Sequence, residues 1–175
     1  MNGNSLPVIE RLTTCTHHLD ALAALLIDAV DSGASVGFLP PLSPAAAQAY
    51  WHGVDAGLAR NRILLAAHAG GELAGSVQLE LAGQPNGTHR AEVQKLFVMR
   101  RFRRHGIARS LMLALESEAV ASGRNLLVLD TRVGDPAEQL YRQVGYQRVG
   151  VIPAFARNAA GTLDPTVLFY KTLNA

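Results

Sequence analysis

Residues 100–122 constrain the fold most, because they join a cluster of arginines and a glycine to an amphipathic helix. The helix is expected to begin near Ile107, where apolar side chains start to recur at helical spacing, and to end before Gly123. An apolar run at residues 96–98 precedes the arginines and predicts a strand. A strand that leads through a glycine loop into a helix presents unpaired amide N–H groups at the positive end of the helix dipole. These residues therefore predict an anion-binding site.

The pattern of this loop excludes two common nucleotide-binding fingerprints. The chain contains neither G-x-G-x-x-G nor G-x-x-x-x-G-K-[ST]. A second interpretation is a basic surface for nucleic acid, since five arginines fall within ten residues: Arg100, Arg101, Arg103, Arg104 and Arg109. However, the formal net charge of the whole chain is only +2. Arginines confined to one loop favour one small polyanionic ligand, so no nucleic-acid partner is expected.

Hydrophobic periodicity and turn residues divide the chain into strands and helices. Strands are expected at residues 8–13, 62–68, 72–81, 90–99, 125–131, 146–153 and 166–173, and helices at residues 19–30, 44–60, 107–122 and 136–143. Two strands joined through a helix normally lie parallel, so strands 90–99 and 125–131 are expected to form the parallel pair. The fold class is therefore α/β, with a mixed, mostly antiparallel sheet of about seven strands and about four helices on both faces.

Length and composition favour a single cytoplasmic domain. The 175 residues, 49% of them hydrophobic, suffice for one full core, so one domain over residues 1–175 is expected. The single cysteine, Cys15, allows no internal disulfide, has no metal-ligand spacing around it and indicates a reduced setting. The longest apolar stretch, residues 19–30, is interrupted by two aspartates. Neither a metal site, nor a signal peptide, nor a membrane partner is expected.

Two motifs resemble the GCN5-related N-acetyltransferase (GNAT) family. Residues 103–108, R-R-H-G-I-A, match its [Q/R]-x-x-G-x-[G/A] pyrophosphate loop, and residues 137–146, A-E-Q-L-Y-R-Q-V-G-Y, match its A-x-x-[LF]-Y-x-x-x-G-[FY] segment. Gly134 departs from the family, many of whose members have asparagine there. The family's order of strands and helices is the one expected here, so the resemblance covers almost the whole chain. It implies N-acetyltransferase activity with acetyl-CoA as the acetyl donor.

The resemblance also implies which residues hold acetyl-CoA. Backbone groups of the strand before the loop are expected to bind the pantetheine arm, and the loop with the first helical turn is expected to bind the pyrophosphate. The first set is Leu96, Phe97 and Val98, and the second is Arg103, Arg104, His105, Gly106, Ile107 and Ala108. One strand N–H is expected to polarise the thioester oxygen.

Three residues are the candidates for catalysis of acetyl transfer. An α-amino group with a pKa of about 8 is mostly protonated in neutral water, so a base must take its proton. Glu92 and Asp130, on the two parallel strands, are the candidate bases; alternatively, Glu92 pairs with Arg90 or Lys95, and Asp130 only closes a turn. Tyr141 matches the family tyrosine that protonates or hydrogen-bonds the departing CoA sulfur. It also lies in an apolar helical stripe typical of core residues.

The acceptor is expected to be the primary amine of a small amino compound. Residues 33–38 and 85–96 resemble GNAT enzymes that inactivate a β-lactam amino-acid toxin. Ser35 and Phe38, in a glycine- and proline-rich loop, are candidates for acceptor binding, although packing of Phe38 into the core explains that residue equally well. The alternatives are an acetyltransferase for a peptide, protein or other drug amine, and an acetyl-CoA-binding module without turnover.

Two further questions concern the route of transfer and the charge of the acceptor. No base accompanies Cys15 in the sequence, so direct transfer in a ternary complex is expected rather than acetylation of the cysteine. An acceptor that carries a carboxylate needs a cation in its cleft. Four residues remain open for this role: Arg90, Lys95, Arg132 and Arg157.

Overall fold

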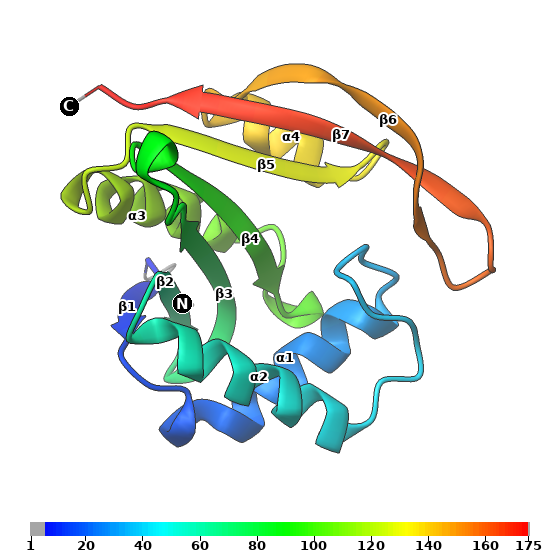
Figure 1. Cartoon of the computed structure of the whole chain (residues 1–175). Helices are drawn as coiled ribbons and strands as arrows, with labels where there is room; N and C mark the ends of the chain where they lie inside the picture. Colours follow the sequence, from blue (N-terminus) through cyan, green and yellow to red (C-terminus); the bar gives the residue numbers. More distant parts are fainter. Residues whose placement is uncertain (1–5, 175) are drawn as a thin grey trace.

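The computed structural model describes residues 6–174, which form a seven-stranded mixed sheet with helices on both faces (Figure 1). The strands are β1 (Val8–Leu12), β2 (Arg62–Ala69), β3 (Glu72–Leu81), β4 (Arg90–Val98), β5 (Leu126–Arg132), β6 (Gln147–Arg157) and β7 (Leu163–Thr172). The helices are α1 (Leu19–Asp31), α2 (Pro44–Leu58), α3 (Ile107–Ala121) and α4 (Ala137–Gln143), with short 3₁₀ turns at Thr16–His18, Pro85–Gly87 and Arg100–Phe102. The strand order is β1-β2-β3-β4-β5-β7-β6. The predicted fold class is confirmed, because β4 and β5 run parallel and the other neighbours in the described sheet are antiparallel.

The two faces of the sheet have separate apolar cores. On one face, α1 and α2 bury a cluster that includes Leu26, Trp51 and Phe97. On the other face, α3 and α4 bury a cluster that includes Leu111 and Tyr141. Each strand of the central sheet alternates its side chains between these layers, so the sheet is covered on both sides and β2 and β3 are apolar over most of their length. The central strands are thereby packed between two apolar layers.

The boundaries of β6 and β7 differ from the prediction. The sequence predicted that β6 ends at Pro153 and that β7 begins at Thr166, but β6 continues to Arg157 and β7 begins at Leu163. Proline is tolerated because β6 is the edge strand, and its register with β7 is irregular between Ile152 and Ala156. The pairing of β7 with β5 ends at Thr166, so the hairpin continues beyond β5 as a curved arm (Figure 1).

Candidate active site

The parallel strands β4 and β5 pair over only three residues. Their ladder runs from Arg90 opposite Leu126 to Glu92 opposite Val128, although both strands continue beyond it. The strands diverge from that point, and a cavity of about 240 Å³ lies where they separate. Its lining brings together β4, β5, the start of α4 and the loop before α2: Ala34, Ser35, Val36, Glu92, Val93, Gln94, Lys95, Leu96, Asp130, Thr131, Asp135, Ala137 and Tyr141. Because β4 has no strand partner on this side after Glu92, its backbone there is available to a ligand.

A β-bulge in β4 lies at this cavity. Gln94 pairs with Gln78 and Phe97 with Ser76, so two residues of β4, Lys95 and Leu96, oppose one residue of β3. Lys95 has a φ of 53°, in the left-handed region. Strict alternation would place Phe97 with Val93 on the α3 face, whereas Phe97 instead packs among the side chains beneath α1 and α2. The bulge therefore resets which side chains face the cavity.

Glu92 and Asp130 both line the cavity, as their positions on parallel strands predicted. Glu92 is exposed, and its Oε1 accepts a hydrogen bond of 3.0 Å from Gln94 Nε2. Within the described residues Glu92 forms no ion pair with Arg90 or Lys95, although its charge acts on the pKa of Lys95. Asp130 Oδ2 accepts a hydrogen bond of 2.6 Å from Thr166 Oγ1 on β7, which fixes this carboxylate at the cavity wall.

Tyr141 belongs to the core and also lines the cavity. Its ring centroid lies 5.9 Å from that of Tyr146 and 6.0 Å from that of Phe169, and only 6% of the residue is exposed. Burial, followed by the negative charges of Asp135 and Asp130, raises the pKa of its hydroxyl. The hydroxyl therefore stays protonated at neutral pH, as a proton donor must. The two interpretations of this tyrosine are compatible.

The four candidate cations occupy different places. Lys95 lines the cavity with Glu92 and Asp130, and its Nζ donates a hydrogen bond of 2.7 Å to the carbonyl of Val36. Burial lowers the pKa of this lysine, against the opposing effect of the Asp130 and Glu92 charges. Arg90 does not line this cavity.

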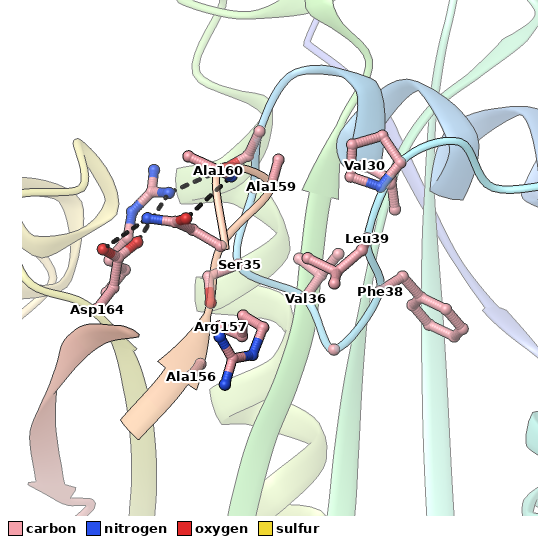
Figure 2. A pocket seen from close by; sticks show the side chains of 16 residues that line it. Val30, Ser35, Val36, Phe38, Leu39, Ala156, Arg157, Ala159, Ala160 and Asp164 are labelled. Carbon is pink, nitrogen blue, oxygen red and sulfur yellow. Dashed lines mark hydrogen bonds and ion pairs between the residues drawn. The ribbon is translucent and has the colours of Figure 1, made fainter. Parts of the chain in front are cut away.

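A larger cavity of about 500 Å³ adjoins the first, between the loop at residues 33–40 and the β6–β7 arm (Figure 2). Arg132 and Arg157 line it. Arg132 Nη1 donates to the carbonyl of Gly33 at 3.1 Å, and its guanidinium lies 3.6 and 3.7 Å from the carboxylates of Asp135 and Asp164. Arg157 Nη1 donates to the carbonyl of Gly161, across the turn of the arm.

The two loop residues predicted to bind the acceptor behave differently. Ser35 is exposed and lines both cavities. Phe38 lines only the larger one, and its ring packs edge-on against Tyr50 with the centroids 5.3 Å apart. Figure 2 shows this ring turned away from Asp164 and the β6–β7 arm. Phe38 thus anchors the loop on α2, whereas Ser35 stands where the cavities meet.

The glycine loop before α3 has the backbone geometry that an anion needs. Gly106 precedes the helix with a φ of 78°, and no side chain caps the first turn. A Cβ at Gly106 would meet no atom within 4 Å, so the approach to the first-turn N–H groups is open. His105 Nδ1 lies 2.8 Å from the carbonyl oxygen of Arg103 and closes the loop locally. The open N-terminus and the unpaired edge of β4 fit the pyrophosphate and the pantetheine arm of a coenzyme A ester.

Most of the arginines around this loop form ion pairs or hydrogen bonds within the protein. Arg100 pairs with Asp28 at 2.7 Å, and Arg101 pairs with Glu72. The side chain of Arg103 donates to the carbonyl of Val98 at 3.2 Å and to Ser32 Oγ at 2.8 Å. Arg104 and Arg109 are exposed and have no ion-pair partner among residues 6–174. The cluster therefore offers less free positive charge than the sequence suggests, which weakens the interpretation as a nucleic-acid surface.

Within residues 6–174, no three His, Cys, Asp or Glu side chains gather as a metal ion would require. No helix in that range is both long and apolar enough to cross a membrane.

Comparison with known proteins assigns the class of enzyme. The model of the Acetyltransferase (GNAT) family matches residues 27–146. An uncharacterized N-acetyltransferase in the hisH-hisA intergenic region of Azospirillum brasilense is 37% identical over 127 residues, which cover 71% of this chain and 74% of that protein. The chain therefore belongs to the GNAT family, and it is an N-acetyltransferase whose acetyl donor is acetyl-CoA.

Solved structures agree with this fold. An N-acetyltransferase from Staphylococcus aureus Mu50 matches with a TM-score of 0.80 and 17% identity, over 95% of this chain and 99% of that one. The structure of yncA from Salmonella typhimurium, determined with its cofactor acetyl-CoA, matches with a TM-score of 0.80 and 16% identity, over 98% of this chain and 96% of that one. At these identities the likeness concerns the fold alone.

Proposed function

We propose that this enzyme acetylates the primary amine of a small amino compound by direct transfer in the cavity between β4 and β5. The observation that carries the proposal is that Glu92, Asp130 and Tyr141, which lie far apart in the sequence, line one cavity at the point where the parallel strands separate. Two carboxylates and a protonated tyrosine supply the proton acceptor and the proton donor that aminolysis of a thioester needs.

Each residue has a role in this scheme. Acetyl-CoA supplies the activated acetyl group as a thioester. Glu92 or Asp130, directly or through a water, takes the proton that the attacking amine loses. A backbone N–H of Leu96, Phe97 or Val98 donates to the thioester oxygen and stabilises the charge that develops there. Tyr141, whose hydroxyl is protonated at neutral pH, donates its proton to the departing CoA sulfur.

The cofactor is held by the backbone rather than by a cluster of free charges. We assign the pyrophosphate to the loop and first helical turn at residues 103–108, with Gly106 allowing the close approach. The side chain of Arg103 is committed to Val98 and Ser32, so its contribution is to fix the loop and add distant charge. Arg104 is exposed and is the arginine of this loop that we expect to reach a phosphate.

Direct transfer is favoured over an acetylated cysteine. Cys15 is 1% exposed, lies outside both cavities, and its backbone N–H is held by Asp55. Burial, reinforced by the charge of Asp55, raises the pKa of its thiol to about 12. Since the thiolate is the nucleophile, this cysteine is unreactive at neutral pH.

The size of the two adjoining cavities favours a small acceptor. Their volumes, about 240 and 500 Å³, are in the range of small-molecule sites, and Ser35 lies at the junction. The likeness of residues 33–38 and 85–96 to the tabtoxin resistance protein suggests a β-lactam amino acid such as tabtoxinine-β-lactam as one acceptor. A cytoplasmic location, where acetyl-CoA is supplied, accords with this role.

The test is thiol release from acetyl-CoA across amino acids, dipeptides, a β-lactam amino acid, aminoglycosides and a lysine peptide. We expect turnover with one class of small amine, and a fall of about 100- to 10,000-fold in kcat for Glu92→Gln or Asp130→Asn, whichever carboxylate is the base. Asp20→Asn is the control, since Asp20 is an exposed carboxylate on α1 that lines neither cavity and accepts a hydrogen bond from Gln48. Saturable acetyl-CoA binding without turnover of any amine would contradict the proposal, and turnover of the peptide alone would redirect it to protein acetylation.

A further inference from the structure

We propose that Lys95 binds the carboxylate of the acceptor, so that this enzyme prefers amines that carry a carboxylate close to the reacting nitrogen. This inference rests on the proposed function, because it names the acceptor class of the same cavity. The chemistry it requires is that of a zwitterionic amino acid. It disfavours polycationic amines and amines on an uncharged chain.

The backbone at Lys95 is held in a costly conformation. Lys95 is one of three non-glycine residues with positive φ among the described residues, the others being Arg104 and Ala154. A residue with a Cβ loses about 1–2 kcal/mol there, and such strain persists where the surrounding structure enforces it, frequently at functional sites. Here the strain comes from the bulge, which places Lys95 at the cavity instead of in regular alternation.

The ammonium group of Lys95 has donors to spare. An ammonium carries three N–H donors, and one of them bonds to the carbonyl of Val36. No carboxylate of the described residues forms an ion pair with Lys95, although Glu92 and Asp130 line the same cavity. Burial lowers the pKa of this lysine, and the charges of Asp130 and Glu92 only partly offset that effect. A bound carboxylate would satisfy the remaining donors and stabilise the charge.

The other cations of the site are less suited to this role. Arg132 already lies beside two carboxylates and a carbonyl. Arg157 lies in the adjoining cavity, on the β6–β7 arm, and Arg90 lines neither cavity. Within a space of about 240 Å³, Lys95 therefore supplies the positive charge and Glu92 with Asp130 the negative charge. That arrangement is complementary to an amino group and a carboxylate that are attached to the same carbon atom.

The experiment compares each acceptor with its own carboxamide, at saturating acetyl-CoA. For the wild type we expect kcat/KM for the free acid to exceed that for the amide by about 10- to 100-fold, the value of a charge-assisted contact. Lys95→Met should remove this preference by raising KM for the acid, while kcat and the KM for the amide change less than about threefold. Methionine and lysine are both unbranched at Cβ, so a positive φ at residue 95 costs about the same in either. The substitution therefore removes the ammonium group without changing the backbone strain. Lys95→Arg should retain most of the preference.

Arg90→Gln is the matched control, since it removes a positive charge from the same strand outside the cavity. It should leave the acid-to-amide ratio unchanged. The inference fails if kcat/KM of the wild type is the same for the amides as for the acids. It also fails if Lys95→Met lowers kcat/KM equally for acids and amides, which is the result expected if the lysine only holds the carbonyl of Val36. Turnover confined to uncharged or polycationic amines would overturn it and leave the proposed function standing. Absence of turnover with every amine would overturn both.

Discussion

The two glycines at the ends of α3 offer a matched test of the cofactor loop. Gly106 precedes the helix with a φ of 78°, Gly123 follows it with a φ of 72°, and a Cβ at either position meets no atom within 4 Å. An alanine at either site therefore costs only the strain of the left-handed backbone, about 1–2 kcal/mol. Chemical denaturation of Gly106→Ala and Gly123→Ala should give similar losses in the free energy of unfolding.

Glutamate at the same two positions separates stability from binding. If the carboxylate of Gly106→Glu lies about 6 Å from one phosphate charge, an effective dielectric constant of about 20 gives roughly 3 kcal/mol of repulsion, or about 100-fold in affinity. The positive end of the helix dipole partly stabilises this variant's fold, so it should remain folded. Gly123→Glu lies at the far end of α3 and should bind acetyl-CoA as the wild type does.

The assay is isothermal titration with acetyl-CoA, with unfolding curves measured on the same samples. We expect a loss of about 100-fold or more in affinity for Gly106→Glu and less than about twofold for Gly123→Glu. Equal affinity of the two glutamate variants would refute the assignment of the pyrophosphate to the N-terminus of α3.

Two further predictions concern stability. Burial raises the pKa of Cys15 from 9.0 to about 12, so between these pH values the unfolded thiol loses its proton while the folded one keeps it. The free energy of unfolding should therefore fall as pH rises above about 9, by at most about 1.4 kcal/mol per pH unit. Urea unfolding at pH 7–10.5 should show a smaller decrease for Cys15→Ala than for the wild type. An equal decrease in both would mean that the tyrosines, and not Cys15, cause the pH dependence. A Cβ at Gly75 would lie 2.6 Å from the backbone oxygen of Phe97, so Gly75→Ala should displace β4 and lower the free energy of unfolding by about 1–3 kcal/mol. At Gly83 an added Cβ meets no atom within 4 Å, so Gly83→Ala should change the free energy of unfolding little. Equal decreases for Gly75→Ala and Gly83→Ala would show that β3 and β4 can move apart without cost.

The fold could be predicted from local signals, because turn residues and apolar periodicity mark nearly every element. Gly33, Gly123 and Gly145 follow helices, and Ser43 with Pro44 begins one, with Ser43 Oγ accepting from Ala46 N at 3.2 Å. The boundaries of the β6–β7 arm were harder to predict from the sequence. Proline normally ends a strand, but in the edge strand β6 its missing N–H faces no partner, and β7 begins before its pairing with β5 does, so both strands are longer than the sequence predicted.

The site was only partly predictable. Glu92 and Asp130 share a cavity because they lie near the ends of neighbouring parallel strands, which follows from topology. The bulge at Lys95 depends on how β3 and β4 pair across the sheet, and no local signal in β4 reports it. Similarly, the partners of Arg100 and Arg103 lie about 70 residues away, at Asp28 and Ser32, so the sequence overestimated the free charge of the loop.

The most direct test of the account is the effect of Tyr141→Phe on turnover and on binding. Phenylalanine keeps the packing against Tyr146 and Phe169. The free energy of unfolding should therefore stay within about 1 kcal/mol of the wild-type value, and the affinity for acetyl-CoA should change by less than about threefold. Removal of the proton donor should lower kcat by about 100-fold. Tyr146→Phe is the control and should retain its activity, because no hydrogen-bond partner of that buried hydroxyl occurs among residues 6–174. Wild-type kcat in Tyr141→Phe would contradict the account and make Tyr141 a core residue alone.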